Sequence, residues 1–179
     1  AGMNAGSTID RQLPELIGKL RSRQLEEKTV VILTSAGGSP ESLGLPLIMC
    51  WPGHIPVESR PPELVGTYDF LPMLCELTGA TAPDRNLCGR SYYPLVLSRP
   101  FPKKERWGSM QYGTFGNTDT ASDSRFKLIL RDGGKGPNQL FDIRDDPKQI
   151  TNEFANRNYI TTRDDFRRNL LAWKAKYSK

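Results

Sequence analysis

The sequence predicts an α/β fold, in which part of a sheet with flanking helices is followed by a small antiparallel sheet packed on a C-terminal helix. Residues 28–33 and 45–51 form two apolar runs bounded by glycine and proline, which is typical of buried strands. From residue 106 the chain changes to short strand-like runs and turns, and it ends in a helical pattern. We therefore expect two parts, residues 1–105 and residues 106–179.

The composition is that of a loop-rich globular protein. The 179 residues are 37% hydrophobic and 25% charged, and a chain of this length can bury roughly 70% of its unfolded surface. No apolar run approaches the ~20 residues of a membrane helix, so a membrane is not an expected partner. The net charge is +5, but the basic residues are scattered, so a nucleic acid is not expected either.

The first helix is expected from Thr8 to Arg23, because apolar residues recur there at helical spacing on one face. Pro14 lies inside this segment. Proline removes a backbone donor and clashes with the preceding turn, so we expect a kink or a restart of the helix there.

Two buried strands are expected next, Val30 to Leu33 and Leu47 to Trp51. Both runs are apolar on every face, as in parallel sheets covered by helices, so we expect a parallel arrangement. Cys50 lies in the second run and is expected as a buried thiol, and Cys75 is expected to be buried on a helix face.

A second helix is expected from about Thr67 to Thr78. Pro72 lies near its start, where proline costs least, and Gly79 is placed to end it. The side chains expected to face inward are Tyr68, Leu71, Leu74, Cys75 and Leu77.

The second part is expected to contain three short strands, Trp107–Tyr112, Phe126–Arg131 and Gln139–Ile143. The glycine-rich segment from Asp132 to Asn138 suits the loop of an antiparallel hairpin.

A final helix is expected to follow these strands. Thr162 and Asp165 have the spacing of a capping box at its start. One stripe of its side chains should lie across the small sheet: Phe166, Leu170, Trp173 and Tyr177.

These runs resemble, in order, motifs of the sulfatases of the alkaline phosphatase superfamily. Residues 28–39 are similar to a sulfatase strand that ends in Thr-Ser-Asp-Asn-Gly or Thr-Ser-Asp-His-Gly, and residues 45–53 are similar to its Val-Pro-Leu-Ile-x-x-Trp-Pro-Gly run. Further similar segments are Tyr68–Gly79, Gly89–Val96, Arg125–Ile129 and Gln139–Pro147. The resemblance covers only the carboxyl-terminal portion of a sulfatase, which implies a partial alkaline-phosphatase-like sheet.

The resemblance implies sulfate-ester hydrolysis with calcium and a formylglycine nucleophile, but the residues for this chemistry are missing. Ala36 and Gly37 stand where the family has metal-binding Asp and Asn or His, and neither side chain offers an oxygen to a hard cation. Residues 38–44 contain no equivalent of the family's substrate-binding lysine, and the Cys-x-Pro-x-Arg or Ser-x-Pro-x-Arg motif is absent. We therefore expect no catalytic residues, no metal site and no cofactor.

Other chemistry-bearing residues are expected to have ordinary roles. Cys88 is followed by Gly89 and Arg90, without the proline and arginine spacing of the nucleophile motif, and His54 lies in a proline-rich loop. The turn from Gly133 to Gly136 lacks the ending and the helix of a phosphate-binding loop.

The charged clusters of the second part are expected to be structural or solvated. Carboxylates at strand ends and turns account for Asp132, Asp142, Asp145 and Asp146, because the segment does not offer the oxygens of a calcium loop. A solvated helix face accounts for Arg167, Arg168, Lys174 and Lys176.

Three functions remain open at this point. The leading hypothesis is a sulfatase-like protein without catalytic activity as an isolated chain. The alternatives are the C-terminal part of a sulfatase completed by a separate N-terminal chain, and a non-enzymatic module that binds an acidic glycan. A homodimer and a sulfated or acidic glycan are the candidate partners. The resemblance suggests a periplasmic or secreted protein, although the chain shows no signal peptide pattern.

Overall fold

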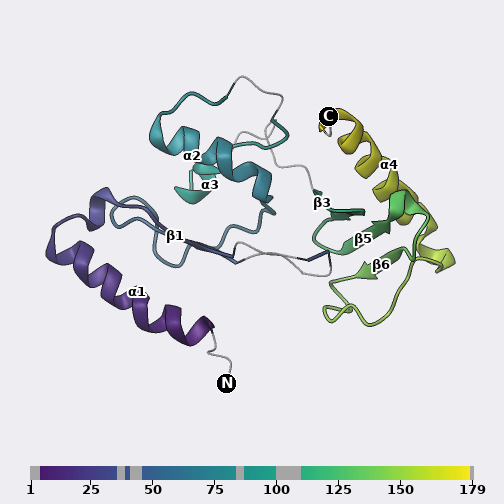
Figure 1. Ribbon diagram of the computed structural model, residues 1–179, viewed down its shortest axis with the longest axis horizontal. Coiled ribbons are helices and arrows are strands. Elements are labelled where there is room, and N and C mark those ends of the chain that lie inside the picture. The colour runs from purple at the N-terminus through teal and green to yellow at the C-terminus, as the bar shows by residue number, and fades with distance from the viewer. Residues whose placement is uncertain (1–4, 36–38, 41–45, 84–86, 100–109, 178–179) are drawn as a thin grey trace.

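The computed structural model describes residues 5–35, 39–40, 46–83, 87–99 and 110–177. An N-terminal helix, a two-stranded sheet and two short helices lie to one side, and a four-stranded sheet with the C-terminal helix lies to the other (Figure 1). The expected boundary between residues 105 and 106 lies outside the described residues. No described helix is long and apolar enough to cross a bilayer.

Helix α1 (Ala5–Ser22) is continuous through Pro14, so the expected restart does not occur. The apolar side of α1 is only partly covered, since Leu16 is 48% exposed. The helix lies at the outer edge of the molecule (Figure 1), and the 3-10 turn η1 (Glu26–Lys28) leads from it into the first strand.

Strands β1 (Val31–Thr34) and β2 (Leu47–Cys50) form an antiparallel pair, with Val31 opposite Cys50. The expected parallel arrangement is wrong. The register places Thr34, at the end of β1, opposite Leu47, at the start of β2, so the chain direction reverses between the strands. The twelve residues that separate them are at the lower limit of the crossover that a parallel pair requires. The expectation for Cys50 is also wrong, because its side chain is exposed.

The second helix is a 3-10 turn, η2 (Thr67–Asp69), followed by α2 (Phe70–Thr78). Gly79 ends α2 in a left-handed conformation with φ of 70°, as expected. The side chain of Met73 on α2 is fully buried. The prediction that Leu71 faces inward is wrong, because this side chain is 43% exposed. The buried side is set by Asp69 and Met73, four positions apart, and Leu71 does not lie on it.

Asp69 locks the end of η2 to a distant segment. Its buried carboxylate accepts hydrogen bonds from the backbone N–H groups of Gly66 and Arg90, each at 2.8 Å. The short helix α3 (Tyr93–Val96) follows Arg90, with Tyr92 buried just before it.

The small sheet has four antiparallel strands in chain order: β3 (Gln111–Phe115), β4 (Thr118–Ser122), β5 (Phe126–Arg131) and β6 (Gln139–Asp142). The β5–β6 hairpin was expected. Strand β4 was missed, because its sequence contains no large apolar side chain. Of the expected strand from residue 107 to 112, residues 107–109 lie outside the described part of the chain.

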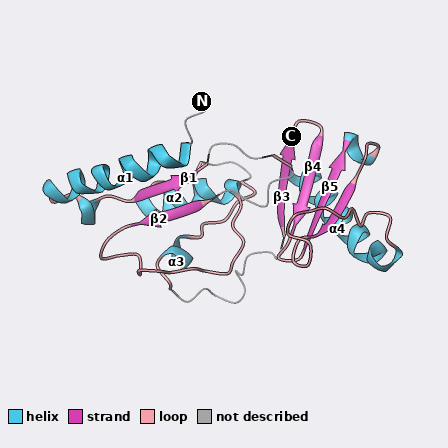
Figure 2. Cartoon of the chain, turned by 90° about the horizontal axis from the view of Figure 1, so that it is seen from below, coloured by secondary structure: helices cyan, strands magenta, loops and turns pink. Residues whose placement is uncertain are grey.

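Helix α4 (Ile160–Tyr177) packs against one face of this sheet (Figure 2). Its Phe166 and Leu170 are buried in a core with Leu128 and Leu140 of the sheet, which confirms the expected stripe. The capping box was wrong, because Thr162 already lies inside the helix. The chain enters α4 through the 3-10 turn η5 (Arg157–Tyr159), which the side chain of Asn156 caps.

Candidate functional site

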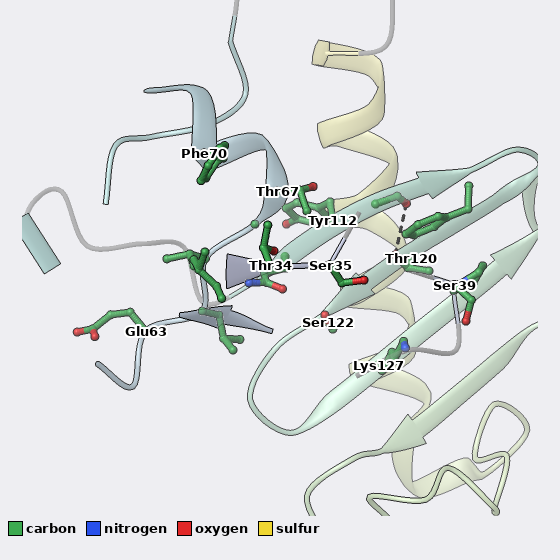
Figure 3. A pocket seen from close by; sticks show the side chains of 18 of the residues that line it. Thr34, Ser35, Ser39, Glu63, Thr67, Phe70, Tyr112, Thr120, Ser122 and Lys127 are labelled. Atoms are coloured by element: carbon green, nitrogen blue, oxygen red, sulfur yellow. Dashed lines mark hydrogen bonds between the residues drawn. The ribbon is translucent and has the colours of Figure 1, made fainter. Parts of the chain in front are cut away.

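A cleft of about 700 Å³ lies between the end of β1, the segment before α2 and the small sheet. Figure 3 shows Thr34 and Ser35 from the β1 side facing the sheet that carries Thr120, Ser122 and Lys127. The cleft therefore lies at the carboxyl end of β1, between the two-stranded sheet with its helices and the four-stranded sheet.

The floor of the cleft is the sheet face opposite α4. Side chains alternate along a strand, so Phe126 and Leu128 of β5 face the core while Lys127 faces the cleft. Lys127 is opposite Ser122 of β4, whose neighbour in the cleft, Thr120, donates a hydrogen bond from Oγ1 to the Gly113 carbonyl at 3.4 Å. This strand pairing gives the floor its polar character.

Aromatic rings line other parts of the cleft. Phe70 and Tyr92 belong to the α2 and α3 side, and Tyr112 and Phe115 belong to β3. Burial raises the pKa of Tyr92 to about 12 and also raises the pKa of Tyr112, so both phenols are neutral at physiological pH. The cleft thus combines apolar rings with hydroxyl groups.

The described lining residues do not form a nucleophile and base pair. They include no cysteine, histidine or aspartate, and their only carboxylate is Glu63. Within the described residues, no group of three His, Cys, Asp or Glu side chains could hold a metal ion. The sequence positions that bear on the family's metal, Ala36 and Gly37, lie outside the described residues.

The cysteine and histidine considered from the sequence lie away from the cleft. Cys88 is partly buried, and burial raises the pKa of its thiol, which disfavours the nucleophilic thiolate. His54 is exposed after β2 and stacks on Trp51, with 3.7 Å between ring centroids. Its Nδ1 lies 3.1 Å from the Pro52 carbonyl oxygen.

The acidic residues at the end of β6 are held by arginine and by backbone groups. Arg125 donates to the buried Asp142 carboxylate from Nε at 3.0 Å and from Nη2 at 2.9 Å. Asp145 pairs with Arg144, which lowers the pKa of that carboxyl group. The Asp146 carboxylate accepts from the Thr151 N–H at 2.8 Å.

The glycine-rich turn and the last helix also have structural contacts. Asp132 begins the 3-10 turn η4 (Asp132–Gly134) of the β5–β6 hairpin. On α4, Arg168 pairs with Asp165, but Lys174 is not merely solvated as expected. Its ammonium lies 2.6 Å from the buried Asp119 carboxylate, because α4 crosses β4 at this point.

The sequence reasoning missed Lys127. A signal was present, since this lysine interrupts an otherwise apolar run in β5. A second feature was also missed: Cys50, Pro52 and His54 have the spacing of the formylglycine motif, with histidine in place of arginine. Cys50 is exposed at the end of β2 and does not line the cleft.

Comparison with known proteins supports the resemblance to sulfatases that the sequence motifs indicate. The profile of the family described as N-sulphoglucosamine sulphohydrolase, C-terminal, matches residues 39–176. This chain belongs to the sulfatase family. It is 29% identical over 168 residues to arylsulfatase K of Gallus gallus, covering 80% of this chain and 31% of that relative. The match to arylsulfatase K of Canis lupus familiaris has the same identity and coverage.

Solved structures show that the fold is the carboxyl-terminal portion of the sulfatase fold. One, a protein in complex with its substrate D-glucosamine-2-N,6-O-disulfate, has a TM-score of 0.81 at 18% identity. It is covered over 39% of its length by 95% of this chain. The phosphonate monoester hydrolase of Agrobacterium radiobacter has a TM-score of 0.74 at 21% identity, with 95% of this chain and 40% of that chain covered. This sulfatase-family chain thus spans about a third of the curated relatives and two fifths of these structures.

Proposed function

We propose that this sulfatase-family chain does not hydrolyse sulfate esters by itself and instead supplies one wall of a sulfatase-type cleft. One observation carries the proposal: the described lining of the cleft at the carboxyl end of β1 has no cysteine, histidine or aspartate. Sulfate-ester hydrolysis needs an activated nucleophile and groups that stabilise charge on the departing sulfate.

The sequence supports the same proposal. The Cys-x-Pro-x-Arg or Ser-x-Pro-x-Arg motif is absent, and Ala36 and Gly37 offer no metal-binding oxygen. The proposal therefore includes no calcium cofactor for this chain. Titration calorimetry with calcium should show no stoichiometric binding, and one bound calcium per chain would contradict this part.

Aryl sulfate hydrolysis by the purified chain tests the proposal. We expect turnover at the level of a buffer blank, because losing one charge-stabilising group alone typically costs ~10²-fold or more. Turnover that survives a second purification and disappears in Cys50→Ala would overturn the proposal and identify the nucleophile. Cys88→Ala is the matched control: both thiols lie outside the cleft, but Cys88 is not followed by a proline two positions later.

A second function is favoured by the two-stranded sheet. Within the described residues, β1 and β2 pair only with each other, and Ile48 of β2 is 59% exposed. Unpaired strand edges beside apolar side chains accept further strands readily. We propose that a separate N-terminal sulfatase chain covers this surface. The completed protein would then act on a sulfated sugar, the class to which the substrate of one structural neighbour belongs.

Co-expression tests this second function. The N-terminal two thirds of an arylsulfatase K would be produced with this chain, and the complex isolated through a tag on one partner. We expect a stoichiometric complex that Ile48→Glu disrupts. Hydrolysis restored in the complex supports the second function. A stable complex without hydrolysis would leave the chain as one wall of the cleft with no part in catalysis.

A further inference from the structure

One face of helix α1 is symmetric about its own midpoint. A shallow crevice of about 480 Å³ runs along this face, and its described lining comes from α1 alone: Asp10, Leu13, Pro14, Ile17, Gly18 and Arg21. Separations of three and four residues place these positions on one side of a helix. Each of them lies as far before the point between residues 15 and 16 as another lies after it. The face therefore has the spacing of a surface that can pair with itself.

The crevice face is open to solvent and carries a charge at each end. Helix α1 lies at the outer edge of the molecule (Figure 1), and both Asp10 and Arg21 are exposed. Within the described part of the chain, Asp10 has no ion-pair partner. Arg21 donates from Nε to Glu26 at 2.9 Å, and its terminal nitrogens supply further donors. A carboxylate and a guanidinium thus stand at opposite ends of one open face.

A second copy of α1 in antiparallel orientation matches these charges. In a two-fold symmetric pair, each contact between unlike residues occurs twice. With the axis at the midpoint of the face, Asp10 meets Arg21 of the second copy, and Arg21 meets its Asp10. In a parallel pair like charges would meet at both ends, which disfavours that orientation.

The centre of the face fits the same pairing. Leu13 and Ile17 form one row along the helix, and Pro14 and Gly18 form the neighbouring row. A two-fold axis perpendicular to the helices brings each row against the same row of the second copy. Leu13 then lies beside Ile17, and Pro14 lies beside Gly18. A Cβ at Gly18 would meet no atom within 4 Å, so this position leaves a notch for the proline ring.

Pro14 and Gly18 are costly residues inside a helix. Proline removes a backbone donor and clashes with the preceding turn, and glycine loses more conformational entropy on folding than other residues. Helix α1 nevertheless continues through both positions, from Ala5 to Ser22. Close packing against a second helix accounts for their place on one open face, because glycine lets another chain approach the backbone.

We propose that α1 is a self-association surface, on which the crevice faces of two chains pair antiparallel through the Asp10 and Arg21 charges and the notch at Gly18. A pair of 18-residue helices buries less than the ~1,600 Å² of a standard interface. The association is therefore expected at near-millimolar rather than micromolar concentration. It goes beyond the proposed function, because it requires neither hydrolysis nor an N-terminal chain.

Exchange of the two charges tests the pairing. Every chain carries Ile48→Glu, which blocks the exposed β2 surface, and sedimentation equilibrium measures self-association up to near-millimolar concentration. Asp10→Lys and Arg21→Glu each place two like-charge pairs in the homodimer, so either alone should weaken association roughly tenfold. An equimolar mixture of the two variants restores both opposite-charge pairs. The mixed dimer should form with nearly the affinity of the original pair.

Two further substitutions separate pairing from helix stability. Gly18→Leu fills the notch and Pro14→Ala removes the ring, yet both replace a poor helix former with a good one. We expect each to weaken self-association roughly tenfold, while the helix content measured by circular dichroism stays equal or rises. Leu16→Gln and Arg23→Glu are the matched controls at exposed positions outside the crevice, and should leave association within about twofold.

Absence of self-association at near-millimolar concentration would overturn the inference, and so would equal effects of Arg21→Glu and Arg23→Glu. A mixture of Asp10→Lys and Arg21→Glu that associates no better than either variant alone would also contradict it. Binding of a separate N-terminal sulfatase chain that depends on Asp10 and Arg21, without self-association, would assign this face to that chain instead. None of these results bears on hydrolysis, so failure here is distinct from failure of the proposed function.

Discussion

The backbone N–H of Tyr112 donates a hydrogen bond to the hydroxyl oxygen of Tyr68 at 3.3 Å, joining strand β3 to the turn before α2. Trp173 of α4 packs against both rings, with centroid distances of 5.3 Å to Tyr112 and 5.9 Å to Tyr68. Segments more than 40 residues apart in the sequence therefore meet in one aromatic cluster. This cluster holds the two walls of the cleft together.

The first prediction concerns alkaline pH. Burial raises the pKa of Tyr68 and of Tyr92 to about 12, against 10.0 for the free side chain. A raised pKa means that the folded state holds the phenolic proton more tightly than the unfolded state. The stability that these groups contribute is therefore fully present below pH 10, and the free energy of unfolding should fall as the pH rises from 10 to 12.

Urea denaturation at several pH values measures this effect. The Tyr68→Phe variant should lose part of the decline between pH 10 and 12, because phenylalanine does not titrate. It should also be less stable at pH 7 by about 1 kcal/mol, since the Tyr112 N–H loses its acceptor. A decline identical to that of the unmodified protein would contradict the assignment to Tyr68.

The second prediction concerns Gly89, which lies against the backbone of η2. A Cβ at this position would overlap the Tyr68 carbonyl oxygen, so Gly89→Ala requires the backbone to move. We expect a loss of about 2–4 kcal/mol in the free energy of unfolding, measured from the urea midpoint. Gly18→Ala is the control. Gly18 lies within α1, a Cβ there would meet no other atom, and the substitution should raise the free energy of unfolding by up to about 1 kcal/mol.

The third prediction concerns the ion pair between Lys174 and the buried Asp119. The Asp119 carboxylate also accepts from the Thr114 hydroxyl at 2.9 Å, and Lys174→Met leaves this bond in place while it removes the ammonium. We expect a loss of about 1–3 kcal/mol in thermal or urea unfolding. Lys148→Met, at an exposed position of the same part, should change stability by less than about 0.5 kcal/mol.

A double-mutant cycle with Asp119→Asn isolates the pair. If the two substitutions are additive, Lys174 and Asp119 do not interact in solution, and the prediction is wrong.

The fourth prediction concerns assembly of the isolated chain. With Ile48 59% exposed and no described third strand beside β1 or β2, we expect a homodimer through this sheet, burying more than about 1,000 Å². Light scattering should give the dimer mass at micromolar concentration, and Ile48→Glu should give the monomer mass. Val57→Glu, at a position already 92% exposed in a loop, should remain dimeric. A monomer at high concentration without any substitution would refute this prediction.

The local chemistry of this chain was readable from its sequence. Gly79 ends α2 in the left-handed conformation, which glycine adopts without strain because it has no Cβ. The turn before Asn138 closes the β5–β6 hairpin. The stripe of Phe166 and Leu170 could also be predicted, because helical spacing alone places both side chains on one face. Family membership was also readable, because it rests on the order of short motifs along the chain.

Strand direction, burial and the cleft were decided only by tertiary structure. Apolar composition does not distinguish a parallel from an antiparallel pair, so the direction of β2 and the exposure of Cys50 depend on what lies beside the strand. Strand β4 forms between two neighbours that supply hydrogen bonds on both sides, although its sequence contains no large apolar residue. Lys127 and Ser35 lie 92 positions apart, and their approach across the cleft depends on contacts that no local pattern encodes.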